Sequence, residues 1–147
     1  METGFLLPDL EDPDSRPFWE GCARGELLVQ VCADCGQRRM PPRPMCYVCR
    51  SLRQRWERVS GRGTIWSFVV AHPPLLPAYE KLAPYNVIVV SLVEDPKIRL
   101  VGNLVASPEG PINEVDPSTI RIGEPVRVVF QKVDDVTFPR WMRDEAR

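Results

Sequence analysis

Histidine and long apolar runs are what this sequence of 147 residues has least of. No stretch reaches the roughly 18 apolar residues that a membrane-spanning helix requires, so we expect no membrane association. Residues 1–10 lack the basic region and apolar run of a secretory signal, and we therefore expect a cytoplasmic protein. His72 is the only histidine, and no Ser/His/Asp order, phosphate-binding glycine loop or carboxylate pair accompanies it. We expect no catalytic residue in the chain.

Glycine is scarce relative to proline, with nine glycines and sixteen prolines. Proline lacks a backbone donor and breaks helix interiors, so the chain is expected to consist mainly of strands, turns and extended connections. The length of 147 residues allows one hydrophobic core and a small additional module. With 44% hydrophobic and 27% charged residues, the composition is that of an ordinary globular protein.

Four of the five cysteines form two pairs, Cys32 with Cys35 and Cys46 with Cys49. Each pair can place both sulfurs on one ion, and four sulfurs complete the tetrahedral site that zinc prefers. In the reducing cytoplasm such pairs bind metal more often than they form disulfides. We therefore predict one structural Zn²⁺, while a rubredoxin-like iron centre or two disulfides would use the same residues. Because four thiolates close the coordination sphere, the metal is expected to stabilise the fold and do no chemistry.

The residues before the cysteine pairs predict a short helix followed by a strand. Within residues 13–25, Phe18 and Cys22 lie four positions apart on one face, and Gly25 can end the helix in a left-handed conformation. Cys22 is outside the metal motif, and we expect it to be a small buried hydrophobic residue. Residues 27–31 predict the strand that leads into the first cysteine pair.

Beyond residue 51 the pattern changes to β-branched runs bounded by turn residues. The runs are residues 64–71, 87–93, 98–106 and 126–133. Residues 60–63 predict a bulge or sharp bend within one long curved strand that starts near Trp56, and residues 94–97 predict a hairpin turn. We predict a mainly β protein with a short N-terminal helix, a rubredoxin-like zinc ribbon and a five-stranded barrel of the oligonucleotide/oligosaccharide-binding (OB) fold. These three parts are expected at residues 1–26, 27–55 and 56–147.

Charge is distributed unevenly, although the net charge is only −1. Residues 1–26 contain seven acids and two arginines, whereas residues 27–62 contain eight arginines and two acids. This asymmetry indicates an anionic partner, an ionic match between the two segments, or solvated arginines on a module too small to bury them. Because zinc ribbons and OB barrels often bind nucleic acid, a nucleic-acid-binding module is the alternative function.

Two of the predicted strands argue against nucleic acid. Residues 87–93 and 98–105 are aliphatic on both faces, whereas OB barrels that bind single strands present aromatic and basic residues there. A strand that is apolar on both faces is covered on both faces. One face fills the barrel, so we expect the other to contact the ribbon and helix or a separate protein.

Further segments accompany the cysteine pairs in a specific order. They are residues 16–21 (Arg-Pro-Phe-Trp-Glu-Gly), 56–67, 83–85 (Ala-Pro-Tyr), 122–126 (Ile-Gly-Glu-Pro-Val) and 138–141 (Phe-Pro-Arg-Trp). Together they resemble the zinc-ribbon plus OB-fold proteins associated with acyl-CoA enzymes, a family known as a domain of unknown function. The resemblance covers nearly the whole chain, and the ribbon is its most specific part.

The resemblance implies a role as a partner of a thiolase-like enzyme. Family members accompany thiolase-like proteins in archaeal acetoacetyl-CoA and hydroxymethylglutaryl-CoA synthesis. Others accompany lipid-transfer-protein-like aldolases that shorten steroid side chains on CoA, where a hot-dog-fold hydratase can be fused to them. It follows from the resemblance that this chain is a non-catalytic accessory subunit of a hetero-oligomer. Such a subunit would stabilise a retro-aldolase for a steroid-like or branched acyl-CoA and contribute to its acyl-CoA channel.

Several residues are candidates for contacts with such a ligand. The candidates are Arg38, Arg39, Arg43, His72 and Tyr85. The phosphates of CoA can accept charge-assisted hydrogen bonds from the three arginines. Tyr79 and Tyr85 flank the proline-rich loop that carries His72, and they are expected to cover the barrel mouth or contact a ligand. An independent acyl-CoA hydrolase or hydratase using His72 is a third hypothesis, but it requires partner residues that the sequence does not show.

Overall fold

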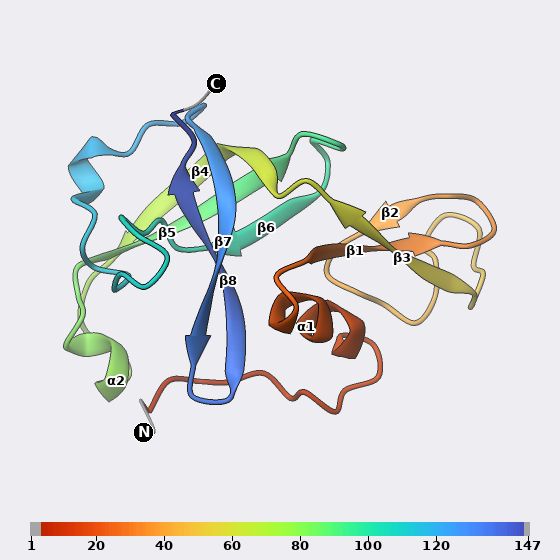
Figure 1. The fold of residues 1–147 in the computed structure, drawn as a ribbon, viewed down its shortest axis with the longest axis horizontal. Helices are drawn as coiled ribbons and strands as arrows, with labels where there is room; N and C mark the ends of the chain where they lie inside the picture. The colour runs from red at the N-terminus through yellow and green to blue at the C-terminus, as the bar shows by residue number, and fades with distance from the viewer. Residues whose placement is uncertain (1–3, 146–147) are drawn as a thin grey trace.

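The computed structural model describes residues 4–145, which form two antiparallel sheets with a helix packed beside both (Figure 1). The elements are α1 (Arg16–Ala23), β1 (Leu27–Cys32), β2 (Arg38–Arg39), β3 (Gln54–Val59), β4 (Arg62–Ala71), α2 (Pro77–Glu80), β5 (Tyr85–Leu92), β6 (Arg99–Gly102), the 3₁₀ turn η1 (Pro117–Thr119), β7 (Pro125–Val133) and β8 (Val136–Arg143). This mainly β architecture confirms the predicted fold class. No helix in the described part of the chain is long and apolar enough to cross a membrane.

Helix α1 forms where the sequence predicts it. Pro17 lies in its first turn, where a missing amide donor costs nothing. Gly25 follows the helix with a φ of 77°, and the amide of Glu26 donates to the carbonyl of Gly21 (2.8 Å). Phe18 and Cys22 are buried, as expected, because this face of α1 packs on β1 and β8.

The smaller sheet is the body of the ribbon, with the strand order β2-β1-β3. β1 and β3 pair along their whole length, from Leu27 opposite Val59 to Cys32 opposite Gln54. Every residue of β1 is buried, since the strand has a neighbour on each side and α1 against it. In Figure 1 this sheet projects from the barrel, with α1 between the two.

The bend predicted at residues 60–63 is present, but the single curved strand is not. Gly61 has a φ of 81° and separates β3, which pairs in the ribbon, from β4, which pairs in the barrel. A side chain at Gly61 would collide with Val128 of β7. The expected continuous strand was wrong because a left-handed residue interrupts the ladder.

The larger sheet is the barrel, with the strand order β6-β5-β4-β7-β8. Its two edges approach each other beyond β6, where the amide of Val105 donates to the carbonyl of Trp141 (2.8 Å) and the amide of Trp141 donates to the carbonyl of Asn103 (3.0 Å). The buried side chain of Asn86 adds hydrogen bonds to both backbone groups of Leu104. These bonds nearly close the five-stranded barrel.

Two expectations about the strands need correction. The run predicted at residues 98–106 is a short strand that ends at Gly102, because the chain then leaves β5 to bond with β8. β8 was missing from the predicted runs, because Pro139 lies within it. Proline is tolerated there because β7 is the only strand that forms a ladder with β8 in the described sheet, and the bonds on the other side of β8 involve Trp141 and not Pro139.

One hydrophobic core joins the ribbon to the barrel. It contains Phe18 and Cys22 of α1, Val29 of β1, Ile88 of β5 and Trp141 of β8 in a single cluster of buried side chains. Trp19 packs beside this cluster and contacts Phe138 of β8 edge to face, with ring centroids 5.5 Å apart. The helix therefore fixes the position of the ribbon sheet on the barrel.

Candidate metal centre and ligand pockets

The four predicted metal ligands come together at the end of the ribbon. The sulfurs of Cys32, Cys35, Cys46 and Cys49 all lie within 4.8 Å of one another. The distance is 3.5 Å between Cys32 and Cys49 and 3.6 Å between Cys35 and Cys46. Four sulfurs at about 2.3 Å from one zinc ion lie about 3.8 Å apart in a tetrahedron. The donor set therefore fits a structural zinc ion, and all four positions are filled by protein.

The two cysteine pairs have the same local geometry, in which backbone amides face sulfur. The amide of Cys35 lies 3.5 Å from the sulfur of Cys32, and the amide of Val48 lies 3.4 Å from the sulfur of Cys46. The hydrogen bond from the Cys35 amide lowers the pKa of the Cys32 thiol to about 6. In the same way the amide of Cys49 lowers the pKa of Cys46. Because the thiolate is the metal ligand, these amides favour the form that binds zinc.

A buried polar group holds the connection between the two cysteine pairs. The side-chain amide of Gln30 donates to the carbonyl of Arg43 (3.0 Å) and accepts from the amide of the same residue (2.8 Å). The Arg39 guanidinium donates to that carbonyl as well (3.0 Å) and to Gln54 (3.2 Å). Gln30 had no role in the sequence-based hypothesis, because a glutamine inside an apolar run gives no indication of its partner.

Arg38 connects the ribbon to the barrel. Its guanidinium donates to Glu57 of β3 (2.9 Å) and lies 3.7 Å from Asp95 in the β5–β6 turn. The hydrogen bond to Glu57 raises the pKa of Arg38. The charge of this candidate phosphate contact is thus matched within the chain.

The three candidate arginines, Arg38, Arg39 and Arg43, all line a small basic pocket of about 270 Å³, together with Lys97 and Tyr47. Arg43 is exposed, whereas Arg39 is buried. The Nε and Nη1 atoms of Arg39 have no hydrogen-bond acceptor among residues 4–145. Because those two Arg39 atoms are buried, Arg43 is the one of this pair whose guanidinium is accessible to a ligand.

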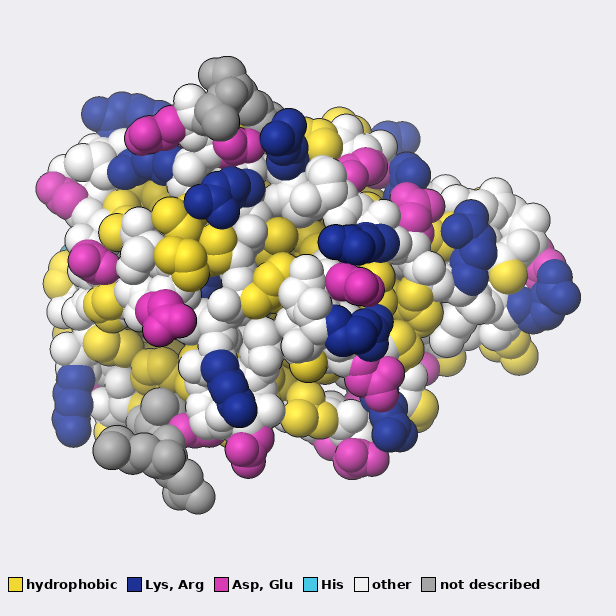
Figure 2. All heavy atoms as spheres, viewed as in Figure 1, with side chains coloured by type: hydrophobic (Ala, Val, Ile, Leu, Met, Phe, Trp, Pro, Cys, Tyr) yellow, Lys and Arg dark blue, Asp and Glu magenta, His cyan; other side chains and the backbone are white. Residues whose placement is uncertain are grey.

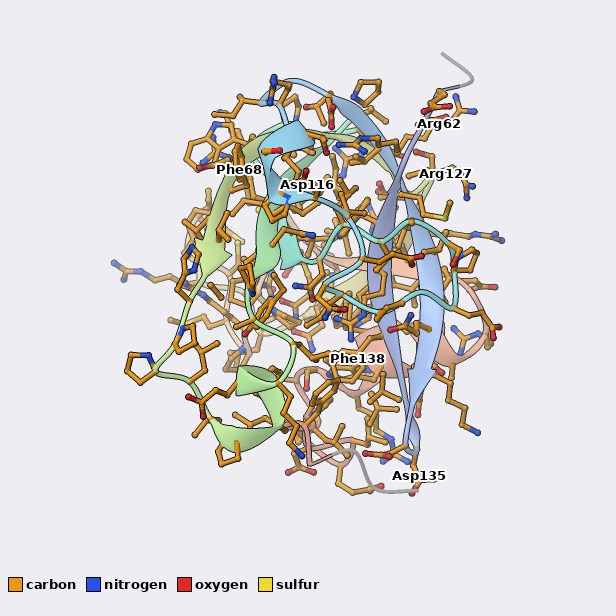
Figure 3. All side chains as sticks on the ribbon, turned by 90° about the vertical axis from the view of Figure 1, so that its left-hand side faces the viewer. Arg62, Phe68, Asp116, Arg127, Asp135 and Phe138 are labelled. Carbon is orange, nitrogen blue, oxygen red and sulfur yellow. The ribbon has the colours of Figure 1, made fainter. Side chains whose placement is uncertain are left out.

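A larger and mostly apolar cavity of about 650 Å³ lies next to the basic pocket, and Met40 and Pro41 line both. Its aromatic walls come from elements far apart in the sequence. They are Phe5, Phe18, Trp19, Tyr79, Tyr85, Phe138 and Trp141. Tyr85, a candidate ligand contact, thus lies in a cavity, and burial raises the pKa of its phenol. Figure 3 views the side of the barrel that carries α2 and labels Phe138.

His72 lies apart from these cavities. It is exposed in the connection between β4 and α2, and within residues 4–145 its side chain has no hydrogen-bond or ion-pair partner. The structure does not place a nucleophile or carboxylate against it. His72 thus lines neither cavity, although its neighbour Ala71 pairs with Tyr85 across β4 and β5.

The outward face of β4, β5 and β6 is apolar and largely uncovered. Val69 pairs with Val87 and Val89 pairs with Val101, so these four valines form a continuous patch. Val69 is 62% exposed and Val101 is 69% exposed. Trp66, half exposed on β4, carries the Arg99 guanidinium 3.9 Å above its ring. Val87 and Val101 also line the apolar cavity, together with Trp19 of α1 and Met40 of the ribbon. The ribbon and α1 thus border this face but leave Val69 and Val101 exposed.

Most of the arginines in residues 27–62 have acidic neighbours. Arg53 bonds to Asp34, and Arg62 lies 3.8 Å from Asp144. In Figure 2 basic and acidic side chains alternate over α1 and the ribbon. Ion pairing with the acidic N-terminal segment is limited to Arg58 and Glu26 (3.9 Å) among the described residues. The arginine cluster is therefore mainly neutralised locally.

Comparison with known proteins adds the family. Residues 19–53 match the family described as "ChsH2, rubredoxin-like zinc ribbon domain", and residues 56–131 match "ChsH2, C-terminal OB-fold domain". The chain belongs to this ChsH2 family. The predicted family resemblance is thus confirmed, and the ribbon match together with the clustered cysteines confirms structural zinc as the cofactor.

Relatives of this ChsH2-family chain include an enzyme subunit and a scaffold protein. The "3-oxo-4,17-pregnadiene-20-carboxyl-CoA hydratase alpha subunit" of Mycobacterium tuberculosis is 34% identical over 95% of this chain. The chain spans only 44% of the length of that relative. The "DUF35 domain-containing scaffold protein" of Methanothermobacter thermautotrophicus is 33% identical over 75% of each chain.

A solved structure named "Ltp2-ChsH2(DUF35) aldolase" has the same fold as this ChsH2-family chain. The sequences are 33% identical, and the match covers 92% of this chain and 98% of the other, with a TM-score of 0.78. The zinc ribbon and the barrel together, rather than either alone, thus correspond to a complete chain in that structure.

Proposed function

We propose that this chain is a non-catalytic accessory subunit that binds and stabilises a thiolase-like, lipid-transfer-protein-like acyl-CoA enzyme. The partner proposed is a retro-aldolase of steroid side-chain degradation, and the chain contributes to its acyl-CoA channel. The observation that carries the proposal is the uncovered valine patch of Val69, Val87, Val89 and Val101. A contiguous apolar surface of this kind on a folded chain is typical of a protein–protein interface.

The names of the relatives support this choice of partner. One similar structure is named as an aldolase of two components, and one similar sequence is named as a hydratase subunit that acts on a steroid-derived CoA ester. A hydratase of the hot-dog fold is proposed as a second enzyme in the same assembly. The present chain covers 44% of the hydratase subunit, so the activity in that name comes to this chain only as part of this proposal.

The two neighbouring pockets support a contribution to acyl-CoA binding. Arg39 and Arg43 line the basic pocket, where phosphates of CoA would accept charge-assisted hydrogen bonds. The apolar cavity with Tyr85 lies next to the basic pocket, where it would hold the acyl group that is attached to CoA. Arg38 is the weakest of the three arginine candidates, because Glu57 and Asp95 already match its charge. His72 is left without a role in this arrangement.

The test of the partner is a pull-down of the tagged chain from its own host lysate, with mass spectrometry of the retained proteins. Recovery of a thiolase-like protein, followed by retro-aldol activity of the reconstituted pair with the partner's own catalytic residues intact, supports the proposal. The pair would then be assayed with Arg39 and Arg43 replaced by alanine. An unchanged CoA affinity would remove the basic pocket from the channel.

Nucleic-acid binding is the second candidate function, carried by the basic pocket that the three arginines and Lys97 line. It predicts binding of oligonucleotides at low ionic strength that weakens steeply as salt is added. Recovery of ribosomal material alone in the pull-down would favour it. Absence of oligonucleotide binding at low salt would exclude it.

A further inference from the structure

Arg140 of β8 is a buried cation whose described neighbours are all neutral. It is only 8% exposed. Its Nε donates to the side-chain oxygen of Gln131 (3.1 Å), and its Nη1 donates to that of Asn103 (2.8 Å). The ring of Phe138 lies 5.1 Å from the guanidinium carbon. Within residues 4–145 no carboxylate lies within 4.0 Å of the guanidinium.

The remaining donors of Arg140 are available to a ligand. A guanidinium presents five N–H groups, and the two neutral acceptors use two of them. Nη2 has no acceptor within the described chain. Unlike the Nε and Nη1 atoms of Arg39, it is not fully buried, so a ligand can reach it. Burial lowers the pKa of Arg140, because a desolvated cation is unfavourable without a counter-charge. An anion bound at Arg140 would supply this counter-charge.

The space in front of Arg140 is the apolar cavity of about 650 Å³, a size typical of small-molecule sites. Trp19 and Phe138 form one wall, and the stacked rings of Phe5 and Tyr79, 4.8 Å apart, form another. The backbone amide of Leu6 donates to the Tyr79 hydroxyl (3.0 Å), which holds the N-terminal segment at the cavity. The walls are therefore suited to an apolar body rather than to a polar one.

We propose that this cavity binds an amphipathic monocarboxylic acid, with the carboxylate on the guanidinium of Arg140 and the apolar body against the aromatic walls. A planar guanidinium matches a carboxylate with paired N–H donors. The site takes the free acid and requires neither CoA nor a partner enzyme, so it goes beyond the proposed accessory function.

The charge of the cavity favours one carboxylate over a phosphate or a nucleotide. Arg99 is the second arginine that lines the cavity, and it is exposed with its guanidinium stacked on Trp66. Among the described residues that line the cavity, Arg140 alone thus presents a buried charge to the interior. A dianionic phosphate would bring one negative charge more than this cation can match.

The experiment compares decanoate with decanamide, which has the same chain length and no charge, by isothermal titration calorimetry on the zinc-loaded chain. Decanoate is expected to bind at least about tenfold more tightly, as a charge-assisted hydrogen bond predicts. Arg140→Gln removes this preference, whereas Arg140→Lys retains part of it because the charge remains. Arg127→Gln is the matched control, since Arg127 is exposed on the neighbouring strand β7.

A second measurement is made on the wild-type protein, and a variant serves only to assign the signal. In the wild-type protein the NMR signal of the Arg140 Nε–H group, identified by its absence in Arg140→Lys, is expected to move with decanoate and to stay in place with decanamide. Equal affinity for the two probes overturns the proposal. So does binding of neither probe, or decanoate binding that is unchanged in a zinc-loaded Arg140→Gln variant.

Discussion

Gly36 and Arg50 occupy equivalent positions behind the two cysteine pairs, and both have a left-handed backbone, with φ values of 77° and 65°. Each follows the second cysteine of its pair. The Gly36 amide donates to the carbonyl of Cys32 (3.0 Å), and the Arg50 amide donates to that of Cys46 (2.9 Å). The two halves of the metal site are built alike, but only the first uses the residue that adopts this conformation without strain.

Replacing Arg50 by glycine is therefore expected to stabilise the protein. Relief of the left-handed strain outweighs the greater flexibility of glycine in the unfolded chain, so the free energy of unfolding should rise by about 0.5–1 kcal/mol. Chemical denaturation of the zinc-loaded protein measures the change. Arg50→Ala is the control, because it removes the same side chain and keeps the strain. A gain in Arg50→Ala equal to that in Arg50→Gly would contradict the explanation.

Loss of one zinc ligand from either pair is expected to abolish metal binding. Metal analysis of the wild-type chain should find about one zinc, whereas Cys32→Ser and Cys46→Ser should retain little and unfold at lower temperature, since site and ribbon form together. Cys22→Ser is the matched control and should keep its zinc. Normal zinc content in both ligand variants would refute the assignment, whereas iron in the wild type would change only the metal.

Cys22 is expected to make stability depend on pH in the alkaline range. Burial raises the pKa of this thiol from 9.0 to about 12, so between these values the folded chain holds a proton that the unfolded chain has released. This stabilising contribution is complete below pH 9 and is lost as the pH rises toward 12. Denaturation of wild type and Cys22→Ala at several pH values tests this, because the variant should lose stability less steeply. Parallel curves would contradict it.

The pair of Arg38 and Glu57 is expected to stabilise the chain modestly. Their side chains are 30% and 28% exposed and lie 2.9 Å apart, so a double-mutant cycle with alanine should give a coupling of about 0.5–1 kcal/mol that falls with added salt. The looser pair of Arg55 and Glu57, at 3.9 Å, provides the comparison and should couple less. A coupling of zero for Arg38 would show that its phosphate-binding capacity remains free.

A charge in the valine patch is expected to block assembly without unfolding the chain. Val101→Glu should prevent recovery of the partner, because a carboxylate in the centre of an apolar interface is desolvated without a counter-charge. Ile122→Glu is the control, since Ile122 is 67% exposed and lies before β7, away from the patch. Equal recovery of the partner with both variants would place the interface elsewhere.

The parts of the structure that depend on local spacing could be predicted from the sequence. The two cysteine pairs fix the metal site because each pair lies within one turn of chain, and Gly25 marks the end of α1 for a similarly local reason. β8 was missed because Pro139 is compatible with a strand only at the edge of a sheet, and strand order is not a local property.

The ligand cavity could not be predicted, because its residues meet only through the tertiary fold. Arg140 lies in residues 138–141, a segment that counted in the sequence only toward the family resemblance. Its burial depends on Gln131 of β7 and on Asn103 beyond β6. Tyr85 was selected because it lies beside a proline-rich loop in the sequence. Most of the other residues that line the cavity are not near that loop in the sequence, so the same reasoning could not find them.

The junction at Gly61 has a mechanical consequence. Only Ser60 and Gly61 separate β3 from β4, and the side chain of Val128 fills the space against Gly61. At a second point, Arg38 reaches from β2 to Asp95 in the barrel. Because the ribbon sheet is joined to the barrel at these two points, its orientation on the barrel is fixed. A molecule bound at the metal end of the ribbon and another bound at the valine patch would therefore be held at a fixed distance and angle.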